Sequence, residues 1–226
     1  MGKLDIVGVG PGSADYITPA ARNCVLQAQL VIGAQRSLSL FEGDIKGEKM
    51  VLTAKNLAET LKATSEAVKA GKTVALLSTG DPGFSGLLHT VQESGLFSPE
   101  QINVVPGVSS IQVCAARLRL NWESARLFTF HEGQVTEDQK EKLLQAYQRG
   151  NTILLLPDAR GFAPKDIAAF LLQRDADKET QVVVCENLTL ENERVTMMSL
   201  ERLQGQTFGA LSVMVIKQPT GHEVYG

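Results

Sequence analysis

The feature that most constrains this chain is a short apolar run that stops abruptly at a loop of small residues. Residues 73–77 are apolar and partly β-branched, which is typical of a buried strand. The loop at 78–86 contains three glycines and a proline, and its only charge is Asp81. Such a loop can approach a ligand closely, and in α/β sheets ligands bind beyond the carboxyl ends of strands. The alternative is a tight turn in which Asp81 caps a helix that begins near Phe84.

Two more predicted strands in the first half end in loops of the same kind. The strand at 3–9 runs into Gly10-Pro11-Gly12-Ser13, and the strand at 102–105 runs into Pro106-Gly107-Val108-Ser109-Ser110. Helices are predicted between and after the strands, at 19–28, 56–70, 84–93 and 111–120. Strands that alternate with helices indicate a parallel sheet, which places all three loops along one edge.

Helix starts in this half carry recognisable capping residues. Thr18 before Pro19 is a favourable N-cap, and Asn56 and Glu59 have the spacing of a capping box. Ser109 or Ser110 is the expected N-cap of the helix at 111–120. A classical dinucleotide fingerprint is rejected because its third glycine would fall on Ser13 and no acidic residue follows the second strand at 30–35.

The stretch at 120–125 is interpreted as the passage into a second domain, so the expected domains are residues 1–119 and 120–226. Strands are predicted at 126–130, 152–156 and 181–185, with helices at 136–149 and 164–173. After these come two short apolar runs with hairpin-like spacing, at 188–190 and 194–197, and a last strand at 211–216. A mixed sheet is expected here, and residues 218–226 are expected to be a loosely held tail.

Composition narrows the class of protein. The 226 residues are 43% hydrophobic and 21% charged, with a formal net charge of −3, which is typical of a globular protein and disfavours a broad nucleic-acid surface. No apolar stretch is long enough to cross a bilayer and no signal peptide is recognisable, so a soluble cytoplasmic protein is expected. Cys24, Cys114 and Cys185 lie in apolar or helical sequence and predict reduced, buried thiols. With only three histidines, no metal site is expected.

The three loops together, in this order and at this separation, resemble those of the tetrapyrrole (corrin/porphyrin) methylases. Several further stretches are similar to the cobalamin-pathway subgroup called CbiE: residues 31–36, 115–118, 129–133 and 185–188. The resemblance spans residues 4–216. It implies two α/β domains, with a parallel sheet in the first, a mixed sheet in the second and the active site in the cleft between them.

The same resemblance implies an activity and its partners. These are S-adenosylmethionine as cofactor, a homodimer, and methylation at C5 of (cobalt-)precorrin-7 in cobalamin biosynthesis. C15 methylation and decarboxylation are expected to belong to a separate polypeptide. The residues that fall where the family contacts the cofactor are Pro11, Gly80, Asp81, Phe84, Ser109, Ser110, Leu156, Pro157, Ala210 and Leu211. The loop at 157–160 departs from the family pattern because it carries a proline and an acid.

Substrate contacts are expected from arginines, because the macrocycle carries many carboxylate arms. Arg36, Arg117 and Arg119 are the candidates, and the alternative for each is an ordinary solvated helix charge. His131 follows a strand and is the candidate for moving a proton or orienting a substrate arm, as against merely capping the strand. Methyl transfer from a sulfonium is a direct displacement onto a nucleophilic carbon, so a dedicated base is not required.

Other functions remain open at this point. The fold also serves methylation of uroporphyrinogen or other precorrins, diphthine synthesis and methylation of ribosomal RNA. The lack of a clustered Lys/Arg stripe disfavours the RNA role. A corrinoid-binding protein without catalysis is the alternative from a different functional class.

Overall fold

The computed structural model describes residues 2–131 and 134–217. The chain divides into two compact units, Met1–Ser110 and Ile111–Gly226. The boundary expected from the sequence, after residue 119, would leave the helix that follows residue 110 in the first unit. In the structure almost all of that helix belongs to the second unit. The predicted tail at 218–226 lies outside the described residues.

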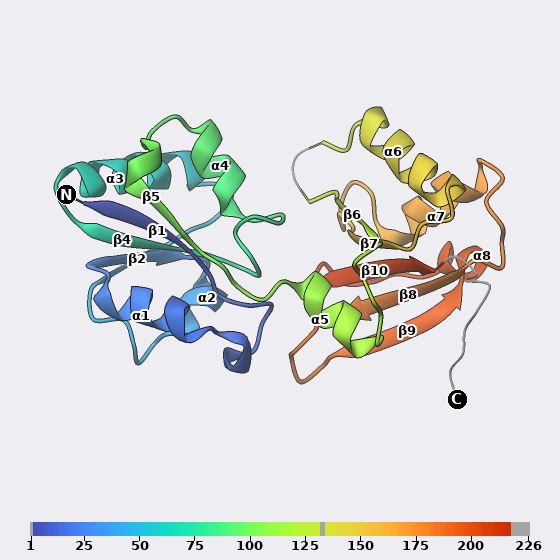
Figure 1. The fold of residues 1–226 in the computed structure, drawn as a ribbon, viewed down its shortest axis with the longest axis horizontal. Coiled ribbons are helices and arrows are strands. Elements are labelled where there is room, and N and C mark those ends of the chain that lie inside the picture. Colours follow the sequence, from blue (N-terminus) through green and yellow to red (C-terminus); the bar gives the residue numbers. More distant parts are fainter. Residues whose placement is uncertain (1, 132–133, 218–226) are drawn as a thin grey trace. The chain divides into compact units, whose positions relative to one another are not determined.

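The first unit is a parallel sheet with helices on both faces (Figure 1). Its strands are β1 (Lys3–Gly8), β2 (Leu30–Gly33), β3 (Glu48–Val51), β4 (Thr73–Ser78) and β5 (Ile102–Val105), in the order β3-β2-β4-β1-β5. Its helices are α1 (Pro19–Gln27), α2 (Gln35–Ser39), α3 (Leu57–Lys69) and α4 (Leu87–Glu93), with 3-10 turns η1 (Ala14–Tyr16) and η2 (Pro99–Gln101). All four strand pairings are parallel, which confirms the predicted sheet.

Alternate residues of these strands are buried on opposite faces, as expected for a sheet covered on both sides. Val7, Val31 and Leu77 pack with α1 and α2 in one apolar cluster. Ile6 and Leu76, one position earlier, pack with α3 and α4 in another. Figure 1 shows the same layering, with α1 and α2 below this sheet and α3 and α4 above it.

The second unit contains the predicted mixed sheet. Its strands are β6 (Arg126–Thr129), β7 (Ile153–Leu156), β8 (Gln181–Glu186), β9 (Arg194–Ser199) and β10 (Ser212–Lys217), in the order β6-β7-β10-β8-β9. Only β6 and β7 pair in parallel, and the other three pairings are antiparallel. Its helices are α5 (Ser110–Arg117), α6 (Glu137–Gln148), α7 (Pro164–Leu172) and α8 (Leu200–Leu203).

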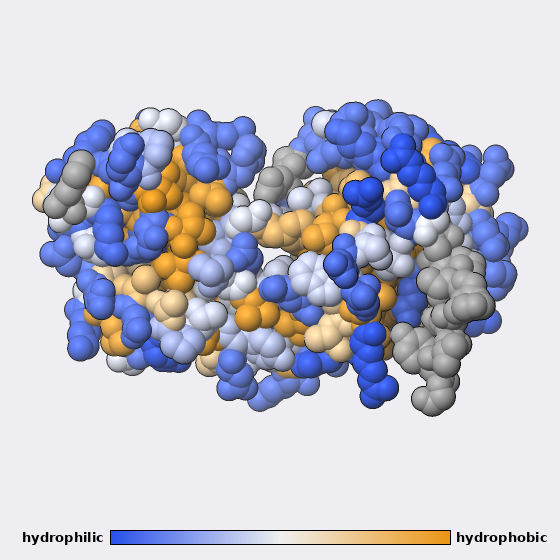
Figure 2. Space-filling model, in the orientation of Figure 1, coloured by the Kyte–Doolittle hydropathy of each residue, from blue (hydrophilic) through white to orange (hydrophobic). Residues whose placement is uncertain are grey.

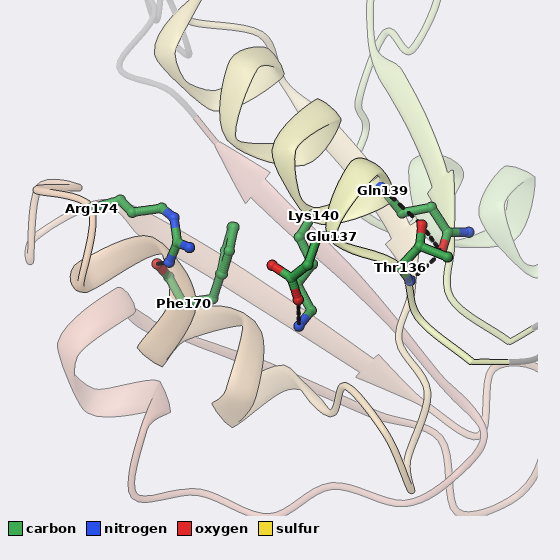
Figure 3. Close-up of polar contacts among 6 residues, drawn as sticks. All are labelled: Thr136, Glu137, Gln139, Lys140, Phe170 and Arg174. Atoms are coloured by element: carbon green, nitrogen blue, oxygen red, sulfur yellow. Dashed lines mark hydrogen bonds and ion pairs between the residues drawn. The ribbon is translucent and has the colours of Figure 1, made fainter.

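Helices α6, α7 and α8 pack on one face of this sheet through a single apolar cluster. Thr136 and Gln139 form a complete capping box at the start of α6, and Lys140 pairs with Glu137 in the first turn (Figure 3). The guanidinium of Arg174 lies 3.8 Å from the ring centroid of Phe170 and donates to that residue's carbonyl. Helix α5 packs on the sheet through Cys114, whose sulfur contacts Cys185 of β8.

Several predicted helices and strands need correction. The capping box of Asn56 and Glu59 is wrong, because the Asn56 side chain accepts from Thr53 N and donates to Val51 O. Helix α4 begins at Leu87, later than predicted, since residues 82–86 form turns. The run at 188–190 is not a strand, and β9 pairs directly with β8 across the connection at 187–193.

The surface over α6 is covered by hydrophilic side chains (Figure 2). This agrees with the burial pattern of the helix, whose buried residues are Leu143, Leu144 and Ala146. Within residues 2–131 and 134–217, no helix combines the length and the apolar character needed to cross a membrane.

Candidate functional site

The three small-residue loops of the first unit meet at one edge of the sheet. Strands β4, β1 and β5 are neighbours, with Val7 level with Leu77 on one side and with Val105 on the other. The β1 and β4 loops are joined by a bridge in which Gly80 N donates to Gly10 O at 2.9 Å. The predicted convergence of these loops is therefore confirmed.

Glycine is required where the loops touch. A Cβ on Gly107 would lie 2.3 Å from Gly80 O and 2.7 Å from Gly8 Cα, and a Cβ on Gly8 would lie 2.5 Å from Gly107 N. Backbone atoms at such distances cannot move aside without displacing a whole loop. The three loops thus form one close-packed backbone unit.

Asp81 holds these loops together with its carboxylate. One oxygen accepts from Gly83 N at 2.8 Å and the other from Gly107 N at 3.0 Å, so the side chain links the β4 loop to the β5 loop. Asp81 does not cap helix α4, so the alternative prediction is wrong. The N–H of Leu87, the first residue of α4, donates to the Ser78 hydroxyl at 3.2 Å.

The other predicted residues of this unit lie around the same edge. Pro11 is buried directly after the Gly10 bridge, Phe84 is half-buried in the β4 loop, and Ser109 is buried immediately before Ser110 starts α5. Gly80 has a φ of +70°, and a Cβ there would have only the Ser109 Cα within 4 Å, at 3.8 Å. A Cβ at Gly80 would thus meet ordinary van der Waals contact at most, although Gly80 itself is buried.

The second unit has its own edge at which predicted residues collect. Thr129 is level with Leu156, so His131 and Pro157 follow neighbouring strands in the same direction. Strand β10 runs antiparallel to β7, which brings Ala210 and Leu211 to this edge as well. His131 is exposed, and its backbone N–H donates to the Thr129 hydroxyl. Its two successors, at 132–133, lie outside the described residues.

The departure from the family pattern at 157–160 has a structural reason. The Asp158 carboxylate accepts from Arg160 N at 3.1 Å and from Gly161 N at 2.9 Å, and Asp158 forms a bridge with Phe162. Asp158 therefore closes a tight turn after β7, a role that side chains of this type commonly take.

Two carboxylate–arginine pairs lie near the second edge, and of their four residues only Arg117 had been singled out from the sequence, as a candidate for substrate binding. Glu186 at the end of β8 is paired with Arg194, and Glu193 is paired with Arg117 at 2.7 Å. The Arg117 hydrogen bond lowers the pKa of Glu193, and Thr189 N adds a second hydrogen bond at 2.7 Å. The sequence signals were the family-like stretches at 115–118, which contains Arg117, and at 185–188, which contains Glu186.

The three predicted substrate arginines have different surroundings. Arg36 lies in α2, just beyond the end of β2, and Arg119 follows α5 with a φ of +50°. Among the described residues, neither forms an ion pair. Arg117 differs because its guanidinium is already bound to Glu193 through two nitrogens.

The cysteines match the expectation of buried thiols in two cases. Cys114 and Cys185 are buried with their sulfurs 3.6 Å apart, and Cys24 is half-buried. The hydrogen bond that the Cys114 thiol donates to Cys185, together with burial, raises the pKa of Cys114. This thiol therefore stays protonated near neutral pH and is no nucleophile.

Comparison with known proteins gives consistent results. Residues 3–204 match the family described as Tetrapyrrole (Corrin/Porphyrin) Methylases. The chain is 38% identical over 212 residues to a probable cobalt-precorrin-7 C(5)-methyltransferase of Methanocaldococcus jannaschii, covering 93% of this chain and 95% of the relative.

Two solved structures show the same fold. The methyltransferase CobJ has a TM-score of 0.80 at 16% identity, with 100% of this chain and 98% of that one covered. The uroporphyrin-III C-methyl transferase of Thermus thermophilus, solved with S-adenyl homocysteine, has a TM-score of 0.72 at 21% identity, covering 95% of this chain and 92% of that one.

Proposed function

Because the chain belongs to the tetrapyrrole (corrin/porphyrin) methylases, we propose that it transfers a methyl group from S-adenosylmethionine to C5 of (cobalt-)precorrin-7. The observation that carries the choice of substrate is the 38% identity, over nearly the full length of both chains, to the methanococcal relative named for that reaction. The edge formed by the three loops of the first unit supports the choice of cofactor.

The cofactor is proposed to lie against the Gly80 loop, where the backbone has a left-handed φ. S-adenosylmethionine supplies the activated methyl group. Pro11, Phe84, Ser109 and Ser110 are the other contacts proposed for the first unit, and the contacts proposed for the second unit are Leu156, Pro157, Ala210 and Leu211. The role of the protein is to hold the reactants in line and to exclude water.

Asp81 is proposed to support cofactor binding mainly indirectly, by holding the β4 loop and the β5 loop together. Each carboxylate oxygen already accepts one backbone N–H and retains capacity for a second hydrogen bond. Replacing Asp81 with alanine is therefore expected to weaken cofactor affinity more than it slows turnover at saturating cofactor. Unchanged affinity in a titration of Asp81→Ala would contradict this role.

Substrate carboxylates are proposed to bind Arg36 and Arg119, with Arg117 the weaker candidate because Glu193 already neutralises it. A carboxylate arm would have to displace Glu193 to reach that guanidinium with the same geometry. His131 is proposed to orient a substrate arm or to accept a proton released from the ring, and no step requires it to be the sole base.

The assembly and setting of the enzyme are part of the same proposal. It acts in the cytoplasm as a homodimer, and a separate enzyme carries out C15 methylation and decarboxylation on the same pathway. Light scattering of the purified protein tests the dimer: a monomeric mass at micromolar concentration would contradict it.

The decisive experiment incubates the protein with S-adenosylmethionine and either precorrin-7 or its cobalt form, and follows the product by mass spectrometry. The expected result is the gain of one methyl group, located at C5 by NMR. Uroporphyrinogen III under the same conditions is the comparison substrate. Methylation of uroporphyrinogen alone would assign a different reaction, and tetrapyrrole binding without methyl transfer would indicate a carrier.

A further inference from the structure

A buried carboxylate lies beneath the segment that leads into β10. The Glu186 side chain is only 5% exposed, and its two oxygens have different partners. One accepts from Gly209 N at 2.8 Å, and the other accepts from the Arg194 guanidinium, with Nε at 2.7 Å. A buried carboxylate is stable only with such partners, so the pairing fixes where the Glu186 side chain must lie.

Glu186 and its neighbour hold the segment at 209–211 from two sides. Gly209 N donates to the Glu186 side chain, and Leu211 O accepts from Asn187 N at 2.9 Å. Asn187 has a φ of +53°, the left-handed conformation that aims this N–H at the segment. The residues between these two bonds are therefore anchored to the end of β8.

The segment has few other supports. It connects α8 to β10, and Gly209, Ala210 and Leu211 are all exposed, with Leu211 at 43%. Of the residues that connect α8 to β10, only Phe208 packs against the apolar cluster of the second unit. Exposed chain of this kind takes its conformation from the hydrogen bonds that hold it, because little apolar burial contributes.

We propose that Glu186 is a positioning residue for the cofactor: through Gly209 it holds the segment at 209–211 in the conformation in which Ala210 and Leu211 contact the cofactor. This inference rests on the proposed function, which places Ala210 and Leu211 at the cofactor. Glu186 itself does not contact the reacting atoms. Its carboxylate acts through Gly209 N, and the hydrogen bonds from the Arg194 guanidinium hold that carboxylate in place.

The test separates the hydrogen bond from the charge. Glu186→Ala removes the acceptor, whereas Glu186→Gln keeps an amide oxygen that can accept from Gly209 N. Gly209→Pro removes the donor from the other side. Its matched control is Gly209→Ala, which keeps the N–H and whose Cβ would lie at an ordinary 3.6 Å from Glu186 Oε1.

Calorimetric titration with S-adenosylhomocysteine measures affinity, and steady-state kinetics separates KM from kcat. Glu186→Ala and Gly209→Pro are each expected to raise the Kd and the KM for the cofactor about ten-fold, the loss of one charge-assisted hydrogen bond, with kcat little changed. Glu186→Gln and Gly209→Ala are expected to stay within about three-fold of the wild-type Kd.

Hydrogen exchange without ligand gives a second readout that does not depend on the cofactor. The amides of 209–211 are expected to exchange faster in Glu186→Ala and to regain protection in Glu186→Gln. If a folded Glu186→Ala binds S-adenosylhomocysteine like the wild type, or if Glu186→Gln loses as much affinity, this inference is overturned alone. If the wild-type protein does not bind the cofactor, the proposed function fails and this inference fails with it.

Discussion

The two sheet edges at which the candidate residues collect are built by different means. At the edge of the first unit, three loops touch through backbone atoms, with Gly80 N bonded to Gly10 O and no room for a Cβ on Gly107. At the edge of the second unit, side-chain carboxylates make the connections. Glu186 holds Gly209 from beneath, and Glu193 joins the β8–β9 connection to α5 through Arg117.

The difference follows from sheet topology. Parallel neighbours send all their carboxyl ends to one edge, so their loops crowd together and glycine is needed. In an antiparallel pair a carboxyl end lies beside an amino end, so fewer loops that follow a strand crowd together at one edge. Charged side chains can bridge such segments without close backbone contact. The first edge should therefore be sensitive to added volume, and the second to the loss of side-chain hydrogen-bond acceptors.

The largest expected effect is at the contact between the loops. Gly107→Ala would place a Cβ 2.3 Å from a backbone oxygen, so we expect the free energy of unfolding to fall by about 3 kcal/mol in a urea titration. Gly43→Ala is the control, because a Cβ there meets nothing within 4 Å, and it should change stability by less than about 0.5 kcal/mol. Equal stability of the two variants would show that the first edge is not close-packed.

A smaller effect is expected from the one charged side chain that fastens the first edge. Asp81→Ala removes the acceptors of Gly83 N and Gly107 N, which should cost about 1–2 kcal/mol of unfolding free energy. Asp81→Asn retains one acceptor oxygen and should lose about half as much. If Asp81→Ala cost as much as Gly107→Ala, side-chain hydrogen bonds would hold this edge as firmly as backbone packing does, and the contrast with the second unit would weaken.

The smallest effect is expected at the Arg117–Glu193 pair, and it depends on pH. Arg117 lowers the pKa of Glu193 below the value of about 4.3 that a free glutamate has. The pair's stabilisation is therefore fully present above that value and is lost as the pH falls through the lowered pKa. Arg117→Ala should reduce the free energy of unfolding at neutral pH by up to about 1 kcal/mol, because the pair is partly solvated.

The same variant should differ less from the wild type in acid, once the pH has fallen through the lowered pKa of Glu193. Urea titrations at the two pH values measure the change. Lys142→Ala, which removes the exposed partner of Asp138 on α6, is the control and should shift stability at both pH values by only about 0.5 kcal/mol or less. A pH-independent loss in Arg117→Ala would point to lost packing of its side chain instead.

Sequence patterns predicted the sheets well and the connections less well. The strand at 102–105 matches β5, and Thr18 caps α1 by accepting from Ala21 N at 3.1 Å, because these features depend on local residue types. The capping box at Asn56 failed since its side chain bonds to Thr53 and Val51, which precede the helix. Strand β3 was missed because its burial is slight and its sequence, Glu-Lys-Met-Val, has a weak apolar pattern.

In the candidate site too, some residues could be proposed from the sequence and others only from the structure. Pro11, Gly80, Asp81 and Ser109 could be proposed from the sequence because they lie in small-residue loops that resemble those of the family. Glu186 could not be proposed as a positioning residue from the sequence, because the hydrogen bond that Gly209 donates to it is visible only in the structure. The contact between Cys114 and Cys185 is likewise invisible in sequence, as 71 positions separate the two residues.

By itself the amino-acid sequence determined the alternation of strands and helices, the small-residue loops of the first unit and the family to which the chain belongs. These are set by local preferences and by short patterns that a single segment carries whole. The tertiary structure alone decided which carboxylate holds which segment, because Glu186, Arg194 and Gly209 meet only when β8, β9 and β10 pair. Interactions between distant residues depend on that pairing, and no local pattern specifies it.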